Sequence, residues 1–340
     1  MGPSLRIPLR CLLSAAVVAG CAKNDGPGLA PAGDLFALQI PAGFPPLPHR
    51  ADNPMTLASV QLGKALFFDE RLSLGRGFSC ASCHRPGSAF SDTVALSTGV
   101  HGMPGMRNAP SLANVAYHPL LNSDGGAPTL EQQVFVPLFD QAEMDSDPQQ
   151  VVEALRTDPK VAAQSMRAYG RPFDLYVLTR SIANYERSLI GGRSRYDRYL
   201  QGDGTAMSHA EVRGMALFNG MAGCSACHGG SNLSDHAFHN IGLTEDDAAD
   251  PGRQRITLHP QDRGKFKTPS LRNIARTAPY MHDGSMATLE EVITHFNAGG
   301  LHNPNKDPRM SPLHLSPGQM EDLAAFLNAL TDEQPLDRVP

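Results

Sequence analysis

Apolar positions along the chain recur mainly with the spacing of an α-helix, and the alternation typical of β-strands is scarce. Residues 173–190 keep the helical period throughout. Three further segments begin with helix-capping patterns and continue into apolar stripes, at 208–211, 288–291 and 316–319. The pattern therefore predicts a mainly α-helical protein whose helices are connected by long Gly- and Pro-rich loops.

Three blocks of sequence occur twice and in the same order. They are 63–67 with 214–218, 87–92 with 230–235, and 108–116 with 267–275. Ordered repetition of this kind indicates two copies of one structural unit. A Gly-containing stretch near 202–208 separates the copies, so we predict an N-terminal domain at 49–205 and a C-terminal domain at 206–340.

The chain begins with a segment typical of export. Residues 1–20 carry two arginines and then a short apolar run, too short to span a bilayer, which indicates a signal peptide. The residues before Cys21 resemble a bacterial lipobox, which implies cleavage there and lipidation of its thiol; ordinary secretion is the alternative. Residues 21–48 are rich in Pro, Gly and Ala and predict a flexible tether. We expect a periplasmic lipoprotein held to a membrane through Cys21.

Composition narrows the function classes further. The chain has 340 residues and a net charge of −5, so it has room for two domains and no basic footprint for nucleic acid. It contains no tryptophan.

Two short motifs of the form C-x-x-C-H, at 80–84 and 224–228, carry the chemistry. In such a motif the cysteines attach haem c covalently and the histidine binds its iron. A redox-active CxxC needs no adjacent histidine, and a zinc site needs its ligand pairs closer together in the sequence. We therefore predict two haem c groups, attached at Cys80, Cys83, Cys224 and Cys227, with His84 and His228 as iron ligands.

Together with the two Pro-Ser-Leu blocks and residues 278–284, these motifs resemble the bacterial di-haem cytochrome c peroxidase and MauG superfamily. The resemblance extends over nearly all of the chain after residue 52. It implies two cytochrome c-like haem domains, with the peroxide site at the His84 haem and electron relay at the His228 haem. Short motifs at 52–56, 295–300 and 326–332 look most like the MbnH-type branch, whose members are understood to oxidise a tryptophan of a partner protein.

The resemblance also implies a set of catalytic residues beside the first haem. The family's Gln, Pro and Glu match Gln133, Pro137 and Glu143. Glu143 would move a proton between the peroxide oxygens, Gln133 would orient the peroxide or a water, and Pro137 would shape the pocket. The alternative for Glu143 is a solvated surface acid, because Asp145 and Asp147 follow it closely.

A calcium ion between the domains is implied in the same way. Its ligands would be the side chain of Asn108 and the carbonyls of Thr277 and Pro279, which are the hard oxygen donors that calcium prefers. The alternative is that Asn108 is a turn residue and the other two belong to an ordinary loop.

Two positions depart from the family. Ser123 stands where a tryptophan usually lies between the haems, so electrons must cross by another route. Phe296 stands where a Met or Tyr binds the second iron, and it has no donor atom. His295 lies about 100° round the helix from that position. Other donors nearby are Met281, Met286, Met310 and His302, although core packing is the ordinary role of a methionine.

The sequence therefore favours a periplasmic di-haem peroxidase that reduces hydrogen peroxide with electrons from a small periplasmic donor protein. An alternative is a MauG- or MbnH-type enzyme that uses peroxide to oxidise a side chain of a partner protein. A non-enzymatic electron carrier is disfavoured, because a carrier has no use for a Gln, Pro and Glu set.

Overall fold

The computed structural model describes residues 2, 34–48 and 50–340. Cys21, nearly all of the predicted signal peptide and residues 21–33 of the predicted tether lie outside the described residues. Within the described part of the chain, no helix combines the length and the apolar character needed to cross a bilayer.

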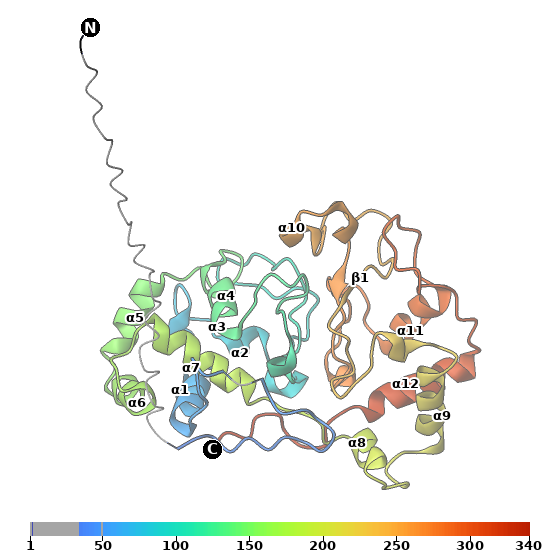
Figure 1. The fold of residues 1–340 in the computed structure, drawn as a ribbon, viewed down its shortest axis with the longest axis horizontal. Helices are drawn as coiled ribbons and strands as arrows, with labels where there is room; N and C mark the ends of the chain where they lie inside the picture. The colour runs from blue at the N-terminus through green and yellow to red at the C-terminus, as the bar shows by residue number, and fades with distance from the viewer. Residues whose placement is uncertain (1, 3–33, 49) are drawn as a thin grey trace. The chain divides into compact units, whose positions relative to one another are not determined.

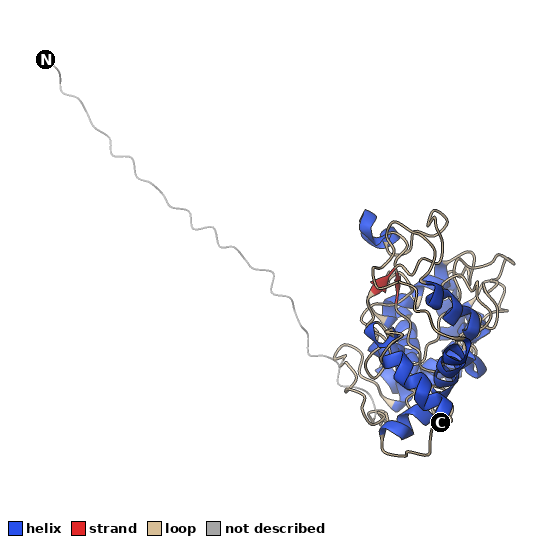
Figure 2. Ribbon diagram, turned by 90° about the vertical axis from the view of Figure 1, so that its right-hand side faces the viewer, coloured by secondary structure: helices blue, strands red, loops and turns tan. Residues whose placement is uncertain are grey.

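The described chain is mainly helical, as predicted, with a single pair of very short strands (Figure 2). The α-helices are α1 (Leu57–Phe67), α2 (Cys80–Cys83), α3 (Leu130–Gln133), α4 (Phe135–Phe139), α5 (Pro148–Arg156), α6 (Pro159–Tyr169), α7 (Leu175–Arg187), α8 (Arg195–Leu200), α9 (His209–Asn219), α10 (Gln254–Thr257), α11 (Leu289–Ala298) and α12 (Pro317–Ala329). The 3₁₀ turns are η1 (Glu70–Leu72), η2 (Pro86–Ser88), η3 (Val115–Tyr117), η4 (Cys224–Ala226), η5 (Pro260–Asp262) and η6 (Ile274–Arg276). Strands β1 (Phe238–His239) and β2 (Phe266–Lys267) pair antiparallel, with Phe238 opposite Lys267.

The predicted helix starts are present as N-caps. Ser208, Thr288 and Ser316 each accept a hydrogen bond from the third residue of the helix that follows, within a capping box. The helical pattern at 173–190 forms a shorter helix, α7, over Leu175–Arg187, and the Asp174 carboxylate fixes its start by accepting from the Val177 N–H.

A crossing of two long helices forms the centre of each half. Helices α1 and α7 pack in the first half, and α9 and α12 pack in the second (Figure 1). Gly63 and Gly214, which are equivalent in the sequence repeat, lie at these crossings. A Cβ atom at Gly63 would collide with the Ser181 carbonyl, and one at Gly214 with the Asp322 carbonyl. In each half, a glycine therefore allows the two helices of the pair to pack closely against each other.

Each helix pair carries its own hydrophobic core. Phe67 and Tyr185 are fully buried in the first core, and Phe326 is fully buried in the second. Burying a side chain of this size contributes about 1.5–3 kcal/mol. The C-terminal residues Leu336 and Val339 pack in the first core, so the end of the chain returns to the half where the described chain begins.

The sequence repeat is also a structural repeat, including in its loops. Ser91 donates to the Ala109 carbonyl at 2.8 Å, and Ser234 donates to the Thr268 carbonyl at 2.7 Å. Antiparallel bridges join Leu121 to Ala127 and, 159 residues later, Tyr280 to Met286. The offset of 159 is the one that relates 108–116 to 267–275, so this part of the repeat extends to residue 127 in the first copy and 286 in the second.

Candidate functional site

Both C-x-x-C-H motifs line one continuous cavity, to which the two halves contribute. The first motif lies on the short helix α2, and the second lies on η4. Each follows the first long helix of its half. The loops after the motifs and the Pro-Ser-Leu blocks form much of the remaining wall.

The two motif histidines are held in the same way. His84 Nδ1 lies 2.9 Å from the Phe90 carbonyl oxygen, and His228 Nδ1 lies 3.2 Å from the Leu233 carbonyl oxygen. Because a carbonyl only accepts, Nδ1 carries the proton in both rings, and Nε2 keeps its lone pair for a metal. Burial lowers the pKa of both imidazoles and keeps them neutral, as an iron ligand must be.

The environment of the motif cysteines differs from that of a redox-active CxxC. Burial raises the pKa of all four thiols, whereas a reactive CxxC needs a thiol with a lowered pKa. In the part of the chain that the structure describes, Cys227 lies with Asp235 and His239 in a group of three potential metal ligands, and this group contains no residue of the first motif. Buried thiols beside a histidine with a free Nε2 fit covalent haem attachment.

The three predicted catalytic residues line this cavity together with His84. Gln133 ends α3, Pro137 lies in α4, and Glu143 follows in the next loop. The Pro137 carbonyl accepts from the Met144 N–H at 3.2 Å, which ties the loop to α4. Burial, and then the charge of nearby Asp140, raises the pKa of Glu143. Glu143 is therefore half-buried and perturbed, unlike the solvated surface acid considered from the sequence.

Glu186 is a further acid in the cavity wall that the sequence reading missed. It lies on α7, is 5% exposed, and its Oε2 atom is buried with no hydrogen-bond partner in the described structure. Burial raises the pKa of Glu186 to about 8, so the carboxyl keeps its proton at neutral pH. Its position four residues after the buried Ile182 is the signal that could have revealed it.

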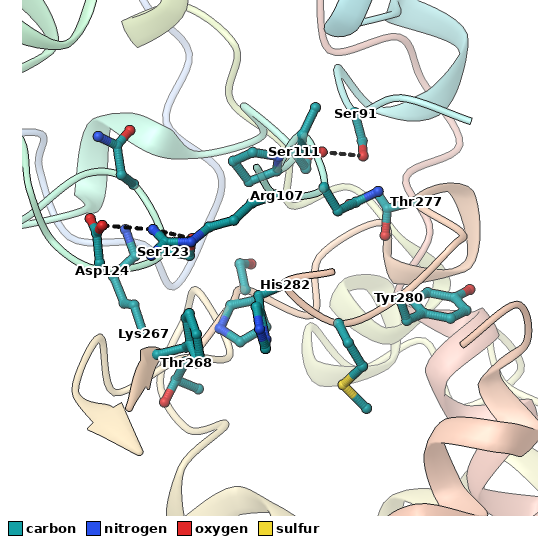
Figure 3. Close-up of a pocket in the computed structure, with 18 of the residues that line it drawn as sticks. Ser91, Arg107, Ser111, Ser123, Asp124, Lys267, Thr268, Thr277, Tyr280 and His282 are labelled. Carbon is teal, nitrogen blue, oxygen red and sulfur yellow. Dashed lines mark hydrogen bonds and ion pairs between the residues drawn. The ribbon is translucent and has the colours of Figure 1, made fainter. Parts of the chain in front are cut away.

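Charged residues join the two halves beside the cavity. Arg107 donates to Asp124 at 2.7 Å and binds Asp250 of the second half through two bonds of 2.7 and 2.8 Å. Lys267 donates to the Leu120 carbonyl at 2.6 Å, and burial lowers the pKa of this amine to about 8. Figure 3 shows Arg107 reaching Asp124, with Lys267 and His282 of the second half nearby.

Ser123, the residue at the usual tryptophan position, lies in this junction. Its carbonyl accepts from the Lys267 N–H at 2.7 Å, and its hydroxyl is 3.4 Å from Arg107. The hydroxymethyl group of Ser123 therefore lies in the cavity wall, at the contact between the two halves.

The residues considered for the sixth ligand position of the second haem differ in whether they line the cavity. Phe296 lines the cavity, whereas His295 Nε2 lies 3.0 Å from the Ile241 carbonyl oxygen, on another side of α11. Met281 and Met310 also line the cavity. Met286 packs beside the second core, and His302 lies outside the cavity wall.

The predicted calcium ligands also lie on this cavity. The Asn108 amide nitrogen donates to the carbonyls of Val94 and Ala95 at 3.0 and 3.1 Å, which leaves its Oδ1 as a free acceptor. Thr277 and Pro279 line the same cavity. Among the hydrogen bonds of the described residues, none ends on the carbonyl oxygens of these two residues.

Comparison with known proteins identifies the family. Residues 57–205 match the family model described as di-haem cytochrome c peroxidase, and residues 211–331 match the model for cytochrome c. The chain is 38% identical over 303 residues to the methylamine utilization protein MauG of Methylorubrum extorquens, covering 88% of this chain and 86% of that protein. The chain belongs to the di-haem cytochrome c peroxidase and MauG family.

Relatives in this di-haem family are named either as MauG or MauG-like proteins or as cytochrome c peroxidases. The chain is 37% identical to the cytochrome-c peroxidase IdrP1 of Denitromonas iodatirespirans, over 95% of this chain and 93% of that one. Among solved structures, a MauG-like protein associated with microbial copper homeostasis superposes with a TM-score of 0.85 at 36% identity, covering 89% of this chain and 97% of that one. Membership makes the chain a di-haem peroxidase, an oxidoreductase acting on peroxide, and implies two c-type haems.

We predict that both motifs bind haem covalently. Two haems per chain should survive acid extraction in a pyridine haemochrome assay, and Cys227→Ala should leave one stable site, because a single thioether tethers the second haem weakly. Ser225→Ala, a change inside the same motif that removes no thiol, is the matched control and should keep both haems. A parent protein with one haem would contradict the prediction.

Proposed function

We propose that this enzyme reduces hydrogen peroxide at the haem bound through His84, using electrons that reach it through the haem bound through His228. The observation that carries the proposal is the gathering of Gln133, Pro137 and Glu143 in one cavity with His84. The haem supplies an iron that binds the peroxide and accepts or donates electrons. The protein supplies proton transfer and orientation.

Glu143 is the proposed acid–base group. Cleavage of bound peroxide requires a proton to leave the inner oxygen and join the outer one, so that water departs. A carboxylate that reaches both oxygens takes the proton at one Oε atom and returns it to the leaving oxygen. Gln133 is proposed to orient the peroxide, while Pro137 anchors the loop that carries Glu143.

The proposed source of electrons is a small periplasmic donor protein. Two electrons per peroxide must enter from outside the chain, since no residue is consumed in a peroxidase cycle. A second candidate is oxidation of a side chain of a partner protein. The match to the MauG-like structure favours this candidate, whereas Phe296 does not discriminate between the two, because it has no donor atom to replace either the Met of the peroxidases or the Tyr of MauG.

Calcium binding between the halves is a further part of the proposal. The free Oδ1 of Asn108 and the unengaged carbonyls of Thr277 and Pro279 are donors of the type calcium takes, and waters would complete its shell. The site would tie the Asn108 loop of the first half to the loop that carries His282.

We also propose a periplasmic location, with a lipid anchor on Cys21. The support is chemical and comes from the sequence: a short apolar export segment, a lipobox-like cleavage site, and two motifs for haem c, which is attached in that compartment.

Replacing Glu143 should slow peroxide cleavage and change its pH dependence. Glu143→Gln keeps the shape but cannot move the proton, so the rate should fall by about 10²–10⁴ while both haem spectra stay unchanged. In the parent, the rate should fall as the pH drops through the pKa of Glu143, because only the carboxylate accepts a proton. Burial raises that pKa, so the fall should begin at a higher pH than for an ordinary glutamate.

Rapid mixing with peroxide between pH 4 and 8 measures both effects. Glu153→Gln, at an exposed position on α5, is the matched control and should behave like the parent. An unchanged rate in Glu143→Gln would assign the proton transfer to another residue.

Steady-state turnover should separate the two candidate functions. With a reduced small cytochrome c present, a peroxidase should oxidise two cytochromes for each peroxide consumed, and peroxide loss should nearly stop without it. Negligible cytochrome oxidation, together with fast reaction of the first haem with peroxide, would favour oxidation of a protein side chain instead.

The second haem should lack the family's usual sixth ligand. We predict either a high-spin or weakly ligated iron, or ligation by Met281 or Met310, the two methionines among our candidate donors that line the cavity. Low-temperature EPR of the oxidised protein separates these states, and Met281→Leu and Met310→Leu identify the donor. Phe296→Met should create a low-spin His/Met site with a raised potential, while Phe296→Leu should not. Loss of a low-spin signal in His295→Ala would contradict the assignment of His295 away from the cavity.

A further inference from the structure

The extended internal repeat relates the residues at the junction to one another. With the offset of 159, Arg107 of the first copy corresponds to Phe266 of the second, and Ser123 corresponds to His282. The position that lacks an indole in the first copy therefore has an aromatic counterpart in the second. All four residues line the cavity that both C-x-x-C-H motifs share.

The two second-copy residues, Phe266 and His282, are in contact with each other. The rings of Phe266 and His282 stack with centroids 3.7 Å apart and planes 14° from parallel. The Arg107 guanidinium carbon lies 5.3 Å from the centre of the Phe266 ring, which adds a planar group from the first half. The backbone N–H of Asn108, next to Arg107, donates to the His282 carbonyl at 2.8 Å. The stack is thus fixed to both halves.

We propose that the stacked Phe266–His282 pair provides the electron route between the two haem sites, in place of the indole that position 123 lacks. The proposal rests on the proposed function, in which His84 and His228 each hold one haem. With haems held by His228 and His84, one electron at a time would pass from the second site to the first, and an external reductant would replace it. Neither ring is oxidised or reduced, and no proton moves, because the rings serve only as closely packed π systems.

A competing route across the junction has a less favourable geometry. His118 of the first half and His236 of the second lie with ring centroids 4.8 Å apart and planes 53° from parallel. His118 lines the cavity but His236 does not. Lys267 Nζ also lies 3.4 Å from His118 Nδ1, so each pair has one cationic side chain beside it and the two pairs differ in ring geometry. The parallel stack with both rings on the cavity offers closer π contact.

The test measures electron redistribution without peroxide. A light pulse with a flavin photoreductant delivers one electron to the anaerobic oxidised protein, and absorbance follows its movement between the haems. Phe266→Leu should lose the fast phase of this redistribution, because it removes the ring and keeps most of the volume. Phe266→Tyr keeps the stacked ring and should restore the fast phase. Spectroelectrochemical titration should find both haem potentials unchanged in each variant, so that the driving force is constant.

Two matched controls sharpen the result. Phe238→Leu removes a ring of the same strand pair that has a comparable contact, with the Arg253 guanidinium carbon 3.8 Å from its centre, but lies off the cavity. His236→Leu interrupts the competing pair. Both should keep the fast phase.

The outcomes separate this proposal from the proposed function. A parent protein with fewer than two haems would contradict the proposed function itself. Two haems with an unchanged fast phase in Phe266→Leu would overturn the Phe266–His282 route alone, as would loss of the fast phase in His236→Leu or an equal loss in Phe238→Leu. A slowed phase in Phe266→Leu that Phe266→Tyr does not restore would also overturn it.

Discussion

The hydrogen bond from each motif histidine to a loop carbonyl is the constraint on which the site depends. It fixes the tautomer, and therefore which nitrogen can bind iron. The carbonyls belong to Phe90 and Leu233, and serine hydroxyls hold the loops that carry them: Ser111 binds the Ala89 carbonyl at 2.5 Å, and Ser270 binds that of Asn232 at 2.7 Å. The Pro-Ser-Leu blocks thus support the loops that orient the two predicted iron ligands.

Buried charged residues hold the two halves together at their junction. Asp124 is 1% exposed, and Arg107 compensates it while also reaching Asp250 across the junction. Such a network adds little net stability over apolar packing, but removing one partner leaves a buried charge uncompensated, which is strongly destabilising. The cost of separating these charges favours one relative position of the halves, and the stacked rings of Phe266 and His282 depend on that position.

The sequence predicted the helical class, the capped starts of α9, α11 and α12, and the internal repeat, because these depend on local patterns. Two c-type haems, which family membership implies, were also predictable from the sequence, since C-x-x-C-H carries its chemistry within five positions. For Glu186 the sequence holds only a weak signal, the position four residues after Ile182, because the burial of this acid depends on the packing of α7 against the cavity. The contact of Phe266 with His282 joins residues 16 positions apart through strand β2 and a loop, and no local period encodes it. The sequence repeat did contain part of this information. If the repeat of 108–116 and 267–275 is continued one residue towards the N-terminus, it aligns Arg107 with Phe266.

Two glutamates in one cavity wall differ in a way that bears on proton transfer. Glu186 is buried on α7 with 5% of its surface exposed, and burial raises its pKa to about 8. Glu143 is only partly buried, and its loop is tied through the Pro137 and Glu143 carbonyls to backbone N–H groups of Met144 and Val100. Gly99 permits the close approach of that loop, since a Cβ atom there would collide with the Ala142 and Glu143 carbonyls. A carboxyl that cycles its proton needs a raised pKa together with access to solvent, and of the two acids only Glu143 combines them.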